Sequence, residues 1–158
     1  MKLLTIFGES YSLVEYRSSK DHVDFKNREV VVEHYKRSSE AVLRDFLDQL
    51  LYDKFSDIAR DFKSGGKIDL FGNLDFEITE KIDKKKQRIA KLKGNKILVT
   101  RKAVSLPENI LKYIVAHEIA HIVSKRHTER FWKTVGLIFP DYLQAQELLA
   151  NHSKSIAD

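Results

Sequence analysis

Two histidines and a glutamate form the motif His117-Glu118-Ile119-Ala120-His121, a pattern typical of zinc sites on helices. A spacing of i, i+4 puts both imidazoles on one face of a helix, about one turn apart, where they can bind the same ion. Glu118 is rotated by about 100° from His117, so we expect it to act as a general base toward water rather than as a ligand. The motif therefore predicts metal-assisted hydrolysis.

A third ligand is expected from a residue after the motif. His127 follows His121 by six residues, and on a continuous helix it would lie about 240° around the axis and about 9 Å along it. The helix must therefore end first, and the polar stretch 124–126 offers a place for the break, with Thr128 able to cap the next helix. We expect His127 to complete a site for one Zn²⁺ per chain. Glu147 is the alternative, because thermolysin-like enzymes use a glutamate as third ligand.

The elements around the motif are predicted to be helical over residues 105–151. Residues 110–123 are apolar on nearly every face, which indicates a buried central helix. Ser105, three residues before Glu108, is expected to cap its start. Further helices are expected over residues 128–138 and after Pro140. Burying the two histidines and the glutamate of the motif in this helix would cost several kcal/mol of desolvation free energy if they had no partner. A bound metal ion would be such a partner.

In the first two thirds of the chain, the spacing of the apolar residues changes twice. Residues 1–36 contain short apolar runs separated by turn residues and predict strands, whereas residues 38–63 have apolar side chains at steps of three and four and predict one long helix. Residues 67–101 alternate again and predict further strands. We expect an α+β fold, in which a small sheet packs on the long helix and on the helix that carries the motif.

Length and composition limit the class of protein. The 158 residues are 42% hydrophobic and 32% charged, which fits one domain spanning residues 1–158. Cysteine is absent, so any metal must be held by histidine and carboxylate side chains. We expect no signal peptide and no membrane span, and a cytoplasmic location.

Positive charge is concentrated between Lys81 and Lys102. This segment has ten basic residues against Asp83, a net charge of +9 in a chain whose total is +5. Such a surface can attract acidic proteins or proteins associated with nucleic acid. A solvated strand edge protected by lysines is the alternative interpretation.

The C-terminal third resembles a known family. The matching features are the HExxH motif, five residues, His127, a small hydroxyl residue at Thr128, and then Phe131-Trp132. This pattern is similar to that of the YgjP-like metallopeptidases, relatives of the WLM and SprT-type proteases among the zincins. The resemblance implies a zincin-like fold of the minimal gluzincin type, zinc held by His117, His121 and His127, and catalysis by Glu118. Phe131 and Trp132 are expected to serve packing.

Three functions are compatible with these residues. The first is a zinc metallopeptidase acting on peptides or proteins. The second is a metal-dependent hydrolase of a non-peptide bond, such as a nucleotide phosphoanhydride, and the third is a zinc-containing module that binds nucleic acid or protein. A donor for the developing oxyanion is expected in the first case, and the sequence does not rank Tyr113, Tyr142 and Arg130 for that role.

Overall fold

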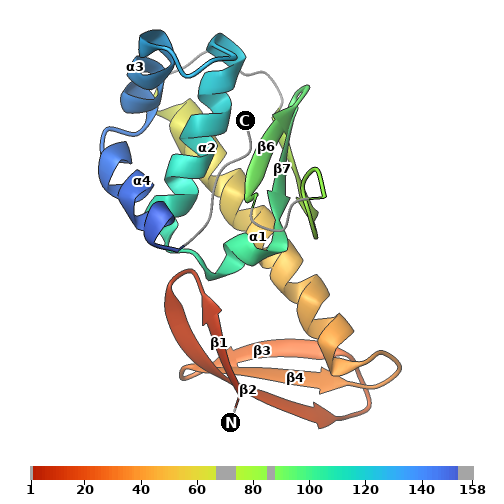
Figure 1. Cartoon of the computed structure of the whole chain (residues 1–158). Helices are drawn as coiled ribbons and strands as arrows, with labels where there is room; N and C mark the ends of the chain where they lie inside the picture. Colours follow the sequence, from red (N-terminus) through yellow and green to blue (C-terminus); the bar gives the residue numbers. More distant parts are fainter. Residues whose placement is uncertain (1, 67–73, 85–87, 153–158) are drawn as a thin grey trace.

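The computed structural model describes residues 2–66, 74–84 and 88–152. The described part is α+β as expected, with one long helix and a cluster of helices at the C-terminal end, but its strands form two small sheets instead of the single sheet that was expected (Figure 1). The elements in chain order are β1 (Lys2–Ile6), β2 (Glu9–Arg17), β3 (His22–Lys26), β4 (Glu29–His34), α1 (Ser39–Ser64), β5 (Asp75–Thr79), β6 (Ala90–Lys93), β7 (Lys96–Thr100), the 3-10 helix η1 (Arg101–Ser105), α2 (Glu108–Val123), α3 (Glu129–Ile138) and α4 (Tyr142–Asn151).

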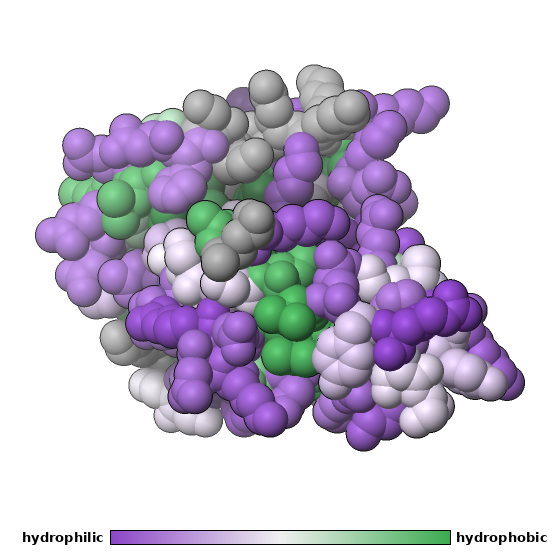
Figure 2. All heavy atoms as spheres, turned by 90° about the horizontal axis from the view of Figure 1, so that it is seen from below, coloured by the Kyte–Doolittle hydropathy of each residue, from purple (hydrophilic) through white to green (hydrophobic). Residues whose placement is uncertain are grey.

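The N-terminal sheet has the strand order β1-β2-β4-β3, with a parallel pair β2–β4 between two antiparallel hairpins. One face packs toward α1: Val30 and Val32 are fully buried, and the rings of Phe25 and Phe46 meet edge-on at 5.5 Å. Seen from below in Figure 2, the molecule has an apolar area surrounded by polar side chains. The sheet lies at the N-terminal end of α1, away from the end of α2 that carries the HExxH motif (Figure 1).

Helix α1 connects the two sheets and begins one residue after the expected start. Ser38 caps it, and its hydroxyl accepts a hydrogen bond from the Ala41 N–H at 3.1 Å. Leu51 and Phe55, near the middle of the helix, are fully buried in the core, and Phe55 stacks on Phe76 of β5 at 5.4 Å. Helix α1 therefore packs against both β5 and α2.

The second sheet has the order β5-β7-β6, so β6 is an edge strand, and this edge lies next to α2. All three strands of this sheet lie within the region 67–101 that was expected to form strands, whereas the tight turn at Gly94 (φ +66), which joins β6 and β7 in a hairpin, was not predicted. Of the expected strand region 67–101, residues 67–73 and 85–87 lie outside the described part.

Helix α2 is the buried central helix that its composition predicts, since every residue from Tyr113 to Ala120 is buried. The expected cap is wrong. Ser105 belongs to η1, where its hydroxyl donates to the Lys102 carbonyl, and Pro107 occupies the N-cap position of α2. Among the described helices, none is long and apolar enough to cross a membrane.

Candidate metal centre

The three histidines predicted as ligands lie together at one end of α2. His117 is 4% exposed and His121 is half-buried, both on α2, whereas His127 is exposed in the segment between α2 and α3. One ring nitrogen from each histidine lies within 4.8 Å of the other two. Three imidazoles at this separation can hold one metal ion and leave a coordination position for water or substrate.

A sharp corner after α2 brings His127 back to the other two histidines. Helix α2 ends at Val123, and Ser124 adopts an extended conformation (φ −145, ψ 123). The Ser124 hydroxyl donates to the Arg126 carbonyl at 2.9 Å and contacts the Thr128 hydroxyl at 3.2 Å. Thr128 caps α3 by accepting from the Phe131 N–H at 3.3 Å. The break therefore falls where the polar stretch predicted it, and the cap is the expected threonine.

Glu147, the alternative third ligand, lies on α4 with its side chain exposed, and it is not part of the group formed by the three histidines.

Hydrogen bonds on the far side of the rings orient two of the histidines. The Nδ1 atom of His121 lies 3.1 Å from the Ser124 carbonyl oxygen. Because a carbonyl can only accept, Nδ1 carries the hydrogen, and Nε2 offers its lone pair to a metal. The Nδ1 atom of His117 lies 3.3 Å from the hydroxyl of Tyr113, one turn earlier on α2. Imidazoles oriented in this way fit the coordination of Zn²⁺.

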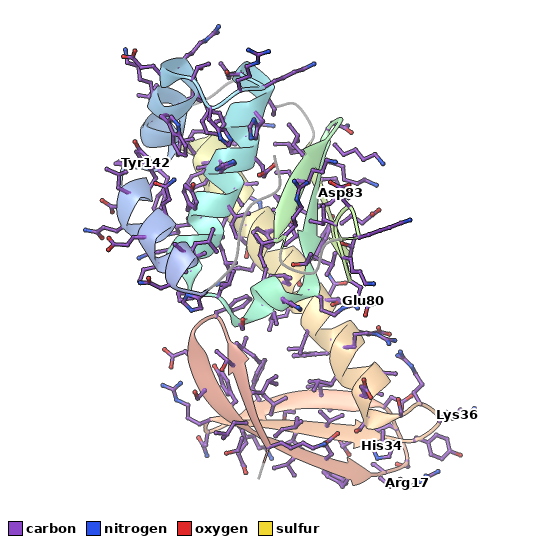
Figure 3. The ribbon with its side chains drawn as sticks, in the orientation of Figure 1. Arg17, His34, Lys36, Glu80, Asp83 and Tyr142 are labelled. Atoms are coloured by element: carbon purple, nitrogen blue, oxygen red, sulfur yellow. The ribbon has the colours of Figure 1, made fainter. Side chains whose placement is uncertain are left out.

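Aromatic side chains of α3 pack against the rings of the three histidines. Phe131 is fully buried, and its ring lies 5.0, 4.6 and 4.7 Å from the rings of His117, His121 and His127. Trp132 is 5.6 Å from His127 and stacks on Tyr142 of α4 at 5.8 Å. Figure 3 shows Tyr142 at the start of α4, facing α3. Phe131 and Trp132 thus serve the packing role expected of them.

Glu118 is fully buried and faces the edge strand of the second sheet. Its Oε1 atom accepts a hydrogen bond from the Leu92 N–H of β6 at 2.7 Å, and its Oε2 atom lies 4.0 Å from Nε2 of His117. The backbone of β6 therefore orients the carboxylate so that one oxygen is turned toward the metal-binding side of His117.

Three groups that orient the side chains of the site were not predicted from the sequence in that role. Tyr113 was only a candidate oxyanion donor, yet its i, i+4 spacing to His117 was a readable signal for a contact between the two side chains. The Leu92 N–H and the Ser124 carbonyl are backbone groups, and side-chain identity carries no signal for them.

The comparison with protein families decides the class of protein. The model of the family described as YgjP-like, metallopeptidase domain, matches residues 2–152. The chain belongs to the YgjP-like metallopeptidase family. It is a zinc metallopeptidase by this membership, and the three histidines are a group that could hold the ion.

A solved structure is similar to the YgjP-like fold described here. It is the crystal structure of the metallopeptidase zymogen of Pyrococcus abyssi abylysin, with a TM-score of 0.55 and 18% sequence identity, covering 65% of this chain and 99% of that chain. At this identity the likeness concerns the fold, which is consistent with a zincin-like arrangement. No curated protein matches the chain.

Proposed function

We propose that His117, His121 and His127 hold the zinc ion and that Glu118 is the general base in peptide-bond hydrolysis. The observation that supports this most is the position of the Glu118 carboxylate, with one oxygen held by the β6 backbone and the other 4.0 Å from Nε2 of His117. A general base must lie within reach of the proton that it accepts, and this carboxylate adjoins the point where the three histidines converge.

The proposed reaction uses residues of this chain as follows. Zinc, when bound, polarises a water molecule and the carbonyl of the scissile peptide bond. Glu118 takes a proton from the water as the water oxygen bonds to the carbonyl carbon. The same carboxyl then donates this proton to the amine nitrogen as the C–N bond breaks, so that water is consumed and two peptides leave. The Leu92 N–H keeps the carboxylate in one orientation through both transfers.

The test separates metal binding from catalysis. Glu118→Gln retains the size of the side chain and removes its basicity, so the variant should keep near-stoichiometric zinc and lose casein or peptide cleavage by at least about a hundredfold. Glu129→Gln is the matched control, because Glu129 on α3 has a side chain that is 85% exposed. Cleavage by Glu118→Gln at the control's rate would overturn the assignment.

A companion measurement tests the ligands. Zinc content by mass spectrometry should fall from about one ion per chain to near zero in His127→Ala, because two imidazoles alone hold zinc weakly. Zinc retained by this variant would point to another third ligand, with Glu147 the first to test.

The substrate is proposed to be a peptide or protein, met in the cytoplasm. An acidic or nucleic-acid-associated partner for residues 81–102 has less support, because several of the basic side chains are paired within the chain. Arg88 and Lys91 pair with Asp83, Lys96 pairs with Glu77, and Arg101 pairs with Asp48. Retardation of DNA or RNA that weakens steeply with salt would support such a partner.

A further inference from the structure

A cavity of about 470 Å³ opens beside the metal centre, between the β6 edge and the exposed side of α2. Glu118 and His121 line its inner end, and Ile122 and Lys125 continue the same wall. Leu92 and Gly94 line the opposite wall, on the β6–β7 hairpin. A peptide seated here would pass directly by the proposed base, so the side chains of this cavity are in position to select its sequence.

The middle of this cavity is apolar. Ile122 is 40% exposed, although the residues before it on α2 from Tyr113 to Ala120 are all buried. Leu92, across the cavity, is half-buried. A partly exposed isoleucine next to a proposed metal ligand provides an apolar surface that a substrate side chain can cover.

The outer end of the cavity is positively charged, and the charge comes from Lys125. Lys91 also lines the cavity, but its ammonium group lies 2.8 Å from Asp83 Oδ2. Asp83 lies on the side of the hairpin turned away from α2 (Figure 3). The pKa of Asp83 is below its usual range because Lys91 donates to it, and Arg88 adds to the effect. The ammonium group of Lys91 therefore already has a carboxylate partner within the chain.

Lys125, in contrast, has no ion pair among the residues that the structure describes. Glu118 is the sole carboxylate among the described lining residues, and it lies at the inner end against the β6 backbone. A carboxylate of the substrate near Lys125 would therefore meet an ammonium group that has no competing partner.

We propose that this cavity selects peptides with an apolar side chain that covers Ile122 and Leu92 and an adjacent acidic side chain that pairs with Lys125. Ile122 and Lys125 are then the specificity-determining residues of the cleft. This inference rests on the proposed peptidase function and extends it from a reaction type to a substrate class.

The test uses a series of fluorogenic peptides in which a Leu-Glu pair occupies successive positions on either side of the cleaved bond. Each peptide is compared with two counterparts, one with Leu-Gln and one with Asn-Glu at the same positions. For the wild type we expect kcat/KM about fivefold higher with the best Leu-Glu peptide than with its Leu-Gln counterpart in 50 mM salt, and nearly equal values in 1 M salt. In Lys125→Gln, kcat/KM should be nearly the same for the Leu-Glu peptide and its Leu-Gln counterpart. Ile122→Thr should lower kcat/KM for Leu peptides about tenfold and have a smaller effect on Asn peptides.

The controls are Lys133→Gln and Leu137→Ser, exposed positions on α3, and zinc content is measured for every variant. Equal cleavage of the Glu and Gln peptides by the wild type would overturn the specificity inference and leave the peptidase function standing. If no peptide were cut by the zinc-loaded protein, the proposed function would fail. Fluorescence anisotropy of labelled Leu-Glu and Leu-Gln peptides would then decide the inference separately, since equal binding would overturn it.

Nucleotide binding is a further outcome of the same experiment. Competition by ATP that is stronger than competition by the Leu-Glu peptide, and that is lost in Lys125→Gln, would overturn the inference and identify the cavity as a polyphosphate site.

Discussion

The hydroxyl of Tyr113 contacts the Nδ1 atom of His117 at 3.3 Å, and Tyr113→Phe removes this hydroxyl. The phenyl ring stays, so the edge-on packing of the two rings at 5.7 Å is retained. When zinc is bound through Nε2 of His117, the Nδ1–H needs an acceptor, and in the variant it has lost the hydroxyl.

The magnitude follows from burial and distance. Tyr113 is 2% exposed and His117 is 4% exposed, so water cannot readily replace the hydroxyl. An unsatisfied buried N–H costs about 1–3 kcal/mol, which is about a 5- to 150-fold loss of affinity. The contact is long, 3.3 Å, which favours the lower part of this range. We expect the zinc Kd of Tyr113→Phe to rise about tenfold.

The assay is a competition titration of zinc between the protein and a fluorescent chelator at neutral pH. Tyr52→Phe is the matched control, because the Tyr52 hydroxyl also makes a hydrogen bond, which it donates at 2.6 Å to Asp75, on β5 at the sheet edge opposite β6. The control should bind zinc as the wild type does. If the zinc Kd of Tyr113→Phe lay within twofold of the values for the wild type and for Tyr52→Phe, the claim that the hydroxyl orients His117 would be refuted.

Three further outcomes are expected. Zinc at about 100 times its Kd should raise the free energy of unfolding by about 2.7 kcal/mol, measured in urea, and the gain should vanish in His127→Ala. Thr128→Ala should lower the free energy of unfolding of the metal-free protein by about 1 kcal/mol, because the Phe131 N–H loses its cap; an unchanged urea midpoint would contradict this. The hydrogen bond from the Tyr52 hydroxyl is the largest cause of the lowered pKa of Asp75. The ionised Asp75 carboxylate therefore stabilises the fold at pH values above the ordinary pKa of aspartate, and this stabilisation is lost as pH falls through the lower pKa of the folded state. The wild type should therefore be more stable than Tyr52→Phe at pH 7, with a difference that shrinks below about pH 4; a constant difference in pH-dependent urea melts would argue against this.

The parts of the site that lie on helices were predictable from the sequence. An i, i+4 pair of histidines has only one geometry on a helix, and the apolar residues on every side of α2 require burial. The corner before His127 was predictable because three polar residues and a threonine cap interrupt the apolar pattern at 124–128. The ligand assignment itself stays a prediction until zinc is measured.

The pairing of strands was not predictable in the same way. Alternation of side chains is the same in parallel and antiparallel neighbours, so nothing in residues 9–34 indicates that β2 pairs with β4 in parallel. Strand β6 has four residues, two of them lysines, and its apolar pattern is too short to indicate which strand it pairs with. Its contribution to the site comes from the backbone N–H of Leu92, a group that every residue except proline possesses.

The three histidines come from one segment of eleven residues, 117–127, whereas the sheets depend on contacts between distant parts of the chain. Closing the loop of five residues between His121 and His127 loses little chain entropy. If the three histidines hold the ion as proposed, zinc binding requires only the end of α2 and the corner after it, and it can precede the slower pairing of β5 with β7 during folding. An early zinc ion would link the last turn of α2 to the start of α3 while Glu118 still awaits the Leu92 N–H, so the ability to bind metal would arise before the ability to cut peptides.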